Sequence, residues 1–367
     1  MIRRKAVKEA AARSHNIDVA LDEEREKRQR EIQLLTLGSA GSGKSTFSKQ
    51  LRILYGDGYP DCERIKFQSQ VYYNIRRAIQ ALITAMKTLR LEYENPEIEF
   101  VADDLCAMES NNFNGNCCSG RRITDCKYCQ PINQDEREKI KSIWKDGGIQ
   151  RCFLQRHKFH LAESSKYFLD DLHRVSAPGY LPTLQDILYI RTPTVGVVEN
   201  IFRIDDVTYR VIDVAGQKSH RKKWIHCFDS VTALIFFTSL SGFNELVDDY
   251  DDNTTNCLRD SLALFKDIAR NVFLKNTDFI LFLNKHDLFV EKLKIFKLKD
   301  SFIQYDGDND TESATDFIQE EFMSRKPDDK TVYPHVTCAT NTEIMKTVII
   351  DVMDIIILIN MRKIRTF

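Results

Sequence analysis

The residues that could carry chemistry begin with a glycine-rich stretch, LTLGSAGSGKSTFSKQL, which spans residues 35–51. Four of its residues fit the spacing G-x-x-x-x-G-K-[ST]: Gly38, Gly43, Lys44 and Ser45. Glycines let successive backbone N–H groups point inward at a phosphate, and the positive end of a following helix adds to the attraction. In this pattern the lysine reaches the β- and γ-phosphates, and the serine hydroxyl ligates Mg²⁺. The stretch therefore predicts a nucleotide phosphate site.

The segments on either side are those that a phosphate loop requires. The run IQLLTL before the loop is apolar and has the length of a strand. After the loop, TFSKQLRIL places Phe47, Leu51 and Leu54 on one face of a helix. A glycine-rich turn with a chance lysine would not need this strand and helix, so the phosphate interpretation is preferred.

A second motif, DFILFLNKHDLF, indicates which base is bound. Residues 279–283 predict a buried strand, and Asn284, Lys285 and Asp287 follow at its carboxyl end, where ligands bind in open α/β sheets. A carboxylate in the plane of the ring accepts two hydrogen bonds from guanine, whereas adenine offers no such pair of donors. We expect Asp287 to recognise guanine, Lys285 to lie over the ring and Asn284 to brace the loops.

Taken alone, an Asn-Lys turn capped by an aspartate would explain this motif equally well, because these residues favour turns. Together with the phosphate loop, guanine is preferred. The tetrapeptide TCAT, residues 337–340, follows another short strand. We expect its backbone N–H groups, around Cys338 and Ala339, to face the guanine oxygen.

A third motif is YRVIDVAGQKSHRKKWIHCF, residues 209–228. Its first residues predict a strand that ends near Asp213, an acid placed to steady Mg²⁺ through a bound water. Gly216 allows its N–H to approach a γ-phosphate, and Gln217 is placed to orient an attacking water. A strand-end acid followed by a plain glycine turn does not account for all three residues.

The motifs GSGKST, DVAGQ, RKKWIHCF, FLNKHDLF and TCAT occur in the order of one known family. The chain resembles the α subunit of a heterotrimeric G protein over nearly its whole length. This resemblance implies a signalling switch that binds and hydrolyses GTP, uses Mg²⁺, and couples a seven-helix receptor and a βγ dimer to effectors. It also implies the nucleotide-binding residues: Ala40, Gly41, Ser42, Gly43, Lys44, Ser45, Thr46, Leu188, Arg191, Asp213, Gly216, Asn284, Lys285, Asp287, Cys338 and Ala339.

The long interval between the phosphate loop and the DVAGQ motif predicts an inserted domain. In SQVYYNIRRAIQALITAMKTLRLEY, apolar residues recur at steps of three and four: Val71, Ile75, Ile79, Leu82, Met86 and Leu89. A second amphipathic series follows in SSKYFLDDLHRV. We therefore predict an α/β fold. A Ras-like P-loop GTPase domain, residues 32–55 and 187–367, contains an inserted all-α helical domain at 56–186 and follows an N-terminal helix at 1–31.

The return from the insertion, PTLQDILYIRTPTVGVVEN, aligns with the family's switch I. The resemblance places Arg191 at the arginine that stabilises charge in the transition state, and it makes Arg191 and Gln217 the catalytic residues. It places Thr194 beside Ser45 as a metal ligand. Without the resemblance, a solvated loop cation would be the better interpretation of Arg191.

The resemblance also suggests where partners bind. The charged N-terminal helix and the segment 218–224 would dock a βγ dimer, the switch regions would contact effectors, and the C-terminal INMRKIRTF would contact the receptor. With 53 basic and 54 acidic residues, the composition gives no indication of nucleic-acid binding.

One departure from the family pattern concerns the rate of hydrolysis. Ala40 stands where the family has its second loop glycine, and its methyl group is expected to project toward the γ-phosphate and the space that Gln217 needs. Slowed hydrolysis is the preferred expectation, and a relaxed loop with no effect is the alternative. A GTP-binding scaffold with strongly reduced hydrolysis is therefore the second function considered. Five further departures affect regulation more than binding: Gly41, Tyr189, Pro193, Ala215 and His220.

The location expected from the sequence is cytoplasmic, peripheral at the inner face of the plasma membrane. No apolar leader is present, and ten dispersed cysteines favour reduced thiols. Ile2 does not fit the myristoylation pattern, and the first cysteine is Cys62, so no terminal lipidation motif is expected. TVIIDVMDIIILINM is interrupted by two aspartates and is expected to be a buried terminal helix.

A cysteine-rich stretch, NGNCCSGRRITDCKYCQ, has no counterpart in the family. It contains Cys117, Cys118, Cys126 and Cys129. The last two have the spacing of zinc ligands, and a surface loop with free thiols is the preferred alternative.

Overall fold

The structure is a computed structural model, and it describes residues 19, 31–107, 127–204, 207–247 and 255–365. Apart from residues 19 and 31, the predicted N-terminal helix lies outside the described residues. So do three of the four cysteines of the cysteine-rich stretch.

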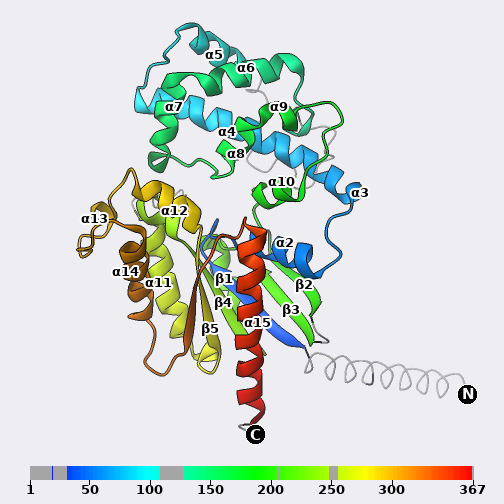
Figure 1. The fold of residues 1–367 in the computed structure, drawn as a ribbon, viewed down its shortest axis with the longest axis vertical. Helices are drawn as coiled ribbons and strands as arrows, with labels where there is room; N and C mark the ends of the chain where they lie inside the picture. Colours follow the sequence, from blue (N-terminus) through cyan, green and yellow to red (C-terminus); the bar gives the residue numbers. More distant parts are fainter. Residues whose placement is uncertain (1–18, 20–30, 108–126, 205–206, 248–254, 366–367) are drawn as a thin grey trace, which may run out of the picture.

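A six-stranded sheet with the order β2-β3-β1-β4-β5-β6 forms the centre of the lower body (Figure 1). The strands are β1 (Ile32–Gly38), β2 (Val197–Ile204), β3 (Val207–Val214), β4 (Ala233–Ser239), β5 (Asp278–Asn284) and β6 (Val332–Val336). All neighbours pair in parallel except β2, which runs antiparallel to β3 at the edge. β1, β4 and β5 are nearly continuous apolar runs because helices cover both faces of the sheet.

Helices form a layer on each side of this sheet. On one side, α2 (Lys44–Tyr55) and α15 (Thr342–Arg365) enclose a core that includes Phe47, Leu51, Phe237 and Phe282. On the other side lie α11 (Cys257–Ala269), α12 (His286–Leu293), α13 (Leu298–Ser301) and α14 (Thr311–Met323). The predicted helical face of α2 is confirmed for Phe47 and Leu51, which are fully buried.

The prediction of a buried terminal helix is confirmed for one face of α15 only. Met345, Ile349 and Val352 pack into the core, whereas Ile350 and Leu358 are exposed. Only one face of the helix packs on the sheet, because no other described element covers its opposite face along most of its length (Figure 1). Among the described residues, no helix combines the length and apolar character needed to cross a membrane.

A separate all-helical body lies above the sheet (Figure 1). It is formed by the part of the chain between α2 and β2. Its helices are α3 (Asp61–Arg64), α4 (Gln68–Leu89), α5 (Glu97–Ala107), α6 (Gln134–Lys145), α7 (Gly147–Leu154), α8 (Ser165–Asp170) and α9 (Leu172–Val175), and α10 (Leu184–Tyr189) connects this body to β2. The long central helix α4 confirms the predicted periodicity, since five of its six predicted apolar positions are buried and Leu89 is partly buried. The second predicted series divides into α8 and α9.

Candidate functional site

The phosphate loop connects the end of β1 to the start of α2, as the sequence predicted. Lys44 begins α2, and its Nζ donates to the carbonyl oxygens of Gly38 and Ser39, each at 2.9 Å. Ser42 Oγ donates to the same Ser39 carbonyl at 2.9 Å. These bonds curl the loop around the lysine and leave Ala40 exposed at its outer bend.

The electrostatics of this loop suit an anion. Burial lowers the pKa of Lys44 to about 8, and the nearby Asp213 carboxylate opposes that shift only in part. A phosphate beside the ammonium would favour its charged form, because an opposite charge stabilises an ion that burial penalises. The buried lysine is therefore a group whose charge a nucleotide would stabilise.

Two glycines are required by close packing at this site. Gly43 has φ +108°, and a Cβ there would lie 2.1 Å from the Asn284 Nδ2 atom. At Gly216 a Cβ would lie 2.5 Å from Lys44 Nζ and 2.7 Å from the Gly38 oxygen. The start of the DVAGQ segment thus lies directly against the phosphate loop.

The predicted metal ligands meet at the other side of the loop. Ser45 Oγ lies 2.6 Å from Thr194 Oγ1 and donates to Asp213 Oδ2 at 2.9 Å. Thr36 Oγ1 also donates to Asp213, at 3.3 Å. Burial raises the pKa of Asp213, while the Lys44 charge and the hydroxyl donors lower it. Two hydroxyls and one carboxylate are hard oxygen donors from three separate elements, and this set fits Mg²⁺.

At the carboxyl end of β5, Asn284 connects this strand to two loops through its side-chain hydrogen bonds. Its Nδ2 donates to the Ser42 carbonyl at 2.8 Å. Its Oδ1 accepts from the Ala339 N–H at 3.0 Å and from Thr337 Oγ1 at 3.1 Å. One buried side chain therefore fixes the phosphate loop and the loop after β6 to each other.

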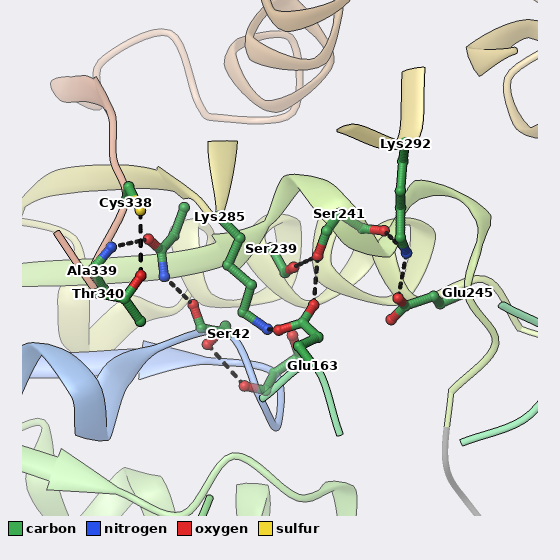
Figure 2. Close-up of polar contacts among 12 residues, drawn as sticks. Ser42, Glu163, Ser239, Ser241, Glu245, Lys285, Lys292, Cys338, Ala339 and Thr340 are labelled. Atoms are coloured by element: carbon green, nitrogen blue, oxygen red, sulfur yellow. Dashed lines mark hydrogen bonds and ion pairs between the residues drawn. The ribbon is translucent and has the colours of Figure 1, made fainter. Parts of the chain in front are cut away.

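Lys285 and Asp287 lie beside this brace at the start of α12. Lys285 occupies the left-handed region, with φ 63°. Its ammonium forms an ion pair with Glu163 of the helical body, and Glu163 also accepts from Ser241 Oγ at 2.7 Å (Figure 2). The N–H of His286, the residue before Asp287, donates to the Thr337 carbonyl at 3.2 Å, so the start of α12 lies against the loop after β6, residues 337–340, which we call the base loop. The five residues predicted for the base site are thus gathered at one corner of the GTPase domain.

Glu163 was missed by the sequence analysis. It lies 122 residues from Lys285 in the chain, and nothing in its local sequence distinguishes it from other charged residues on short connections. The same is true of Lys49, whose Nζ donates to the carbonyls of Ile187 (2.8 Å) and Ile190 (3.0 Å) and so ties α2 to α10.

The two predicted catalytic side chains, Arg191 and Gln217, are both exposed. The backbone of Arg191 is held by Asn74 of α4, which accepts from its N–H at 2.9 Å and donates to its carbonyl at 3.2 Å. Leu188, three residues earlier, is buried in α10. These two bonds hold the main chain of switch I at Arg191, and the Arg191 side chain is exposed to solvent.

The segment after Gln217 forms a 3₁₀ element, η5 (Lys218–Cys227), docked on α11. Trp224 is buried and donates from Nε1 to the Ala215 carbonyl at 2.9 Å. Arg221 pairs with Asp260 of α11 at 2.6 Å. These contacts hold the segment in one arrangement.

The zinc hypothesis gains no support from the residues that the structure describes. Cys129 is buried and forms no disulfide bond with another described residue. Within the described ranges, no group of three or more histidine, cysteine or acidic side chains is placed to hold a metal ion. Cys117, Cys118 and Cys126 lie outside those ranges.

The sheet order, the phosphate loop after β1 and the Asn-Lys-x-Asp corner after β5 define a Ras-like P-loop domain with an inserted helical body. A protein-family model described as the G-protein alpha subunit matches residues 11–356 of the 367-residue chain. The chain belongs to the G-protein alpha subunit family, whose members are GTP-binding signalling subunits and generally GTPases. The predictions of family and fold class are confirmed.

Proposed function

We propose that this chain is a Mg²⁺-dependent GTPase switch in which GTP orders the segments around Thr194 and Gly216 and hydrolysis releases them. The observation that carries the proposal is the convergence of Ser45, Thr194 and Asp213 beside the buried Lys44. Thr194 belongs to switch I, and Asp213 is the next-to-last residue of β3. A ligand bound between them therefore links nucleotide state to the shape of both switches.

Each residue has a separate role in the proposed reaction. The loop amides and Lys44 bind the phosphates, and Gln217 orients the attacking water. Arg191 turns inward to oppose the negative charge that develops in the transition state, so no arginine from a partner is required. Bound Mg²⁺ would neutralise phosphate charge, held by Ser45 and Thr194 directly and by Asp213 through water. Asp287 and the base loop around Cys338 and Ala339 select guanine.

Binding is tested first, by titrating fluorescent GDP in the presence of Mg²⁺ with excess ATP as competitor. We expect tight binding that ATP does not displace. The Asp287→Asn variant should lose the preference for guanine, since an amide cannot accept both donor hydrogens. Equal competition by ATP and GTP would overturn the guanine assignment.

The second candidate, a GTP-binding scaffold, rests on Ala40 at the exposed bend of the phosphate loop. Single-turnover hydrolysis of preloaded GTP distinguishes the two functions when wild type and Ala40→Gly are compared. Faster GTP hydrolysis in Ala40→Gly indicates a switch whose hydrolysis is slowed by Ala40. Equal, measurable hydrolysis rates in the two proteins indicate an ordinary GTPase cycle. Retention of GTP without turnover in both proteins favours the scaffold.

The domain limits and partners follow the same proposal. Residues 32–55 and 187–367 form the GTPase domain, 56–186 form the helical domain and 1–31 form the N-terminal helix. Lys218–Trp224 with the N-terminal helix bind a βγ dimer, the C-terminal tail binds a seven-helix receptor, and the switches bind effectors at the inner face of the plasma membrane. Co-purification with a βγ dimer that depends on GDP tests this part.

A further inference from the structure

The base loop is held by side chains from several elements. Gln50 of α2 donates from Nε2 to the Ala339 carbonyl at 2.9 Å. Gln185 of α10 donates from Nε2 to the Thr340 carbonyl at 3.0 Å, although the two residues lie 155 positions apart in the chain. Together with the bonds from Asn284 at the end of β5, these contacts tie the loop to three elements. The bond from Gln185 differs from the others because α10 connects the helical body to β2.

The start of α10 is firmly held by the helical body. Asp186, the residue after Gln185, is fully buried and forms part of the capping box that begins the helix. Its carboxylate accepts from Arg174 of α9 through two bonds of 2.8 Å. It also accepts from the hydroxyls of Tyr167 and Tyr180, each at 2.8 Å. The helical body therefore sets the position of the backbone from which Gln185 extends.

The end of α10 is held by the GTPase domain. Lys49 of α2 donates from Nζ to the carbonyls of Ile187 and Ile190, at 2.8 and 3.0 Å. Arg191 of switch I follows directly. A helix that is fixed at both ends gives Gln185 a stable position from which to hold the base loop. Displacement of the helical body would remove this support from the loop.

We propose that Gln185 is a positioning residue for nucleotide retention: its bond to the Thr340 carbonyl keeps the base loop against guanine and thereby slows the release of GDP. This inference rests on the proposed function, because that function assigns the base loop to guanine. A glutamine that merely covered the surface of α10 could be replaced by a side chain of similar length without effect. Here the amide donates to the base loop, so loss of the donor alone should change the release rate.

The test measures release of GDP that carries a radioactive phosphate from the full-length protein in Mg²⁺, after addition of excess unlabelled GDP. Gln185→Met keeps the length of the side chain and loses the donor, and we expect release about threefold faster, as for one neutral hydrogen bond. Gln185→Glu keeps the shape and places an acceptor against the carbonyl, so its release should be at least as fast. This second variant keeps the test decisive if the first does not fold.

Gln150→Met is the matched control. Gln150 of α7 also donates from Nε2 to a backbone carbonyl, that of Trp144, but both residues lie within the helical body. This variant loses the same kind of bond and should release GDP as wild type does. Release from Gln185→Met and Gln185→Glu at the wild-type rate would overturn the proposal, as would equal acceleration by Gln150→Met.

A cycle between the residue and the ligand separates positioning of the base loop from a general loosening of the two bodies. In 6-thio-GDP, sulfur replaces the guanine oxygen that the base loop is proposed to meet, and sulfur is the weaker acceptor. Inosine diphosphate keeps that oxygen and lacks the amino group that Asp287 is proposed to bind. We expect Gln185→Met to accelerate release of GDP and of inosine diphosphate by the same factor, and release of 6-thio-GDP by a smaller one. An equal factor for all three nucleotides would show that Gln185 does not act through the base loop, and it would overturn the proposal.

The two hypotheses fail in different ways. A wild-type protein that retains no guanine nucleotide overturns the proposed function and this inference with it. A wild-type protein that retains GDP, together with unchanged release from both Gln185 variants, overturns this inference alone.

Discussion

The brace formed by Asn284 allows the sharpest quantitative prediction. Asn284→Ala removes three hydrogen bonds, to the Ser42 carbonyl, the Ala339 N–H and the Thr337 hydroxyl, at 2.8, 3.0 and 3.1 Å. All three are buried, so each lost bond leaves a polar atom without its partner. At about 1 kcal/mol each, the free energy of unfolding should fall by about 3 kcal/mol. Since two nucleotide-binding loops lose their common anchor, GDP affinity should fall about tenfold or more.

The assay combines urea unfolding of the nucleotide-free protein with titration of fluorescent GDP. Asn133→Ala is the matched control, because Asn133 caps α6 in the helical body and accepts from the Glu136 N–H at 2.9 Å. It should cost about 1 kcal/mol of stability and leave GDP affinity unchanged. If Asn284→Ala lowered the free energy of unfolding by less than about 1 kcal/mol, the three hydrogen bonds would not contribute as we expect. Equal losses of GDP affinity in both variants would refute the role of the brace.

Three further predictions concern single side chains. Gly43→Ala forces a Cβ to within 2.1 Å of the bracing amide at φ +108°, so GDP titration should show binding lost; near-native affinity would mean that the loop can relax. Burial lowers the pKa of Lys49 to about 8 from 10.5, so the unfolded chain binds more protons between these values and this lysine's contribution to unfolding free energy rises with pH there. The unfolding free energy of wild type minus that of Lys49→Met should therefore increase from pH 8 to pH 10, as measured by urea unfolding. A difference that stays constant with pH would contradict the argument. Asp186→Ala leaves the inner face of Arg174 unpaired and should cost about 3 kcal/mol or more of unfolding free energy, whereas Asp171→Ala, which removes the exposed partner of the same arginine, should cost less than about 1 kcal/mol.

Much of the nucleotide site could be predicted because its chemistry is local in the chain. The phosphate loop needs glycine conformations and a lysine within a few residues, and the strands before Gly38 and Asn284 are apolar runs that read as buried. The face of α4 follows from periodicity, since residues at steps of three and four share one side of a helix. Each of these features depends on backbone geometry over a short segment.

The burial of α15 could not be judged in the same way. Its apolar residues surround the helix, and the prediction of a buried terminal helix did not specify which face would be covered. Only the packed structure shows that Met345 and Val352 face the sheet while Ile350 and Leu358 remain exposed. Burial depends on which layers surround an element, and the sequence of the element does not contain that information.

The sequence by itself indicated the class of site: residue types and short spacings predicted the phosphate loop, the motif after β5 favoured guanine once it was taken with that loop, and the resemblance to the family implied the metal ligands. The tertiary structure decided which distant side chains meet there. Glu163 reaches Lys285, and Gln185 of α10 reaches the Thr340 carbonyl, only because the helical body folds back over the base site. Such contacts join residues far apart in the chain, and their geometry is set by the packing of two bodies.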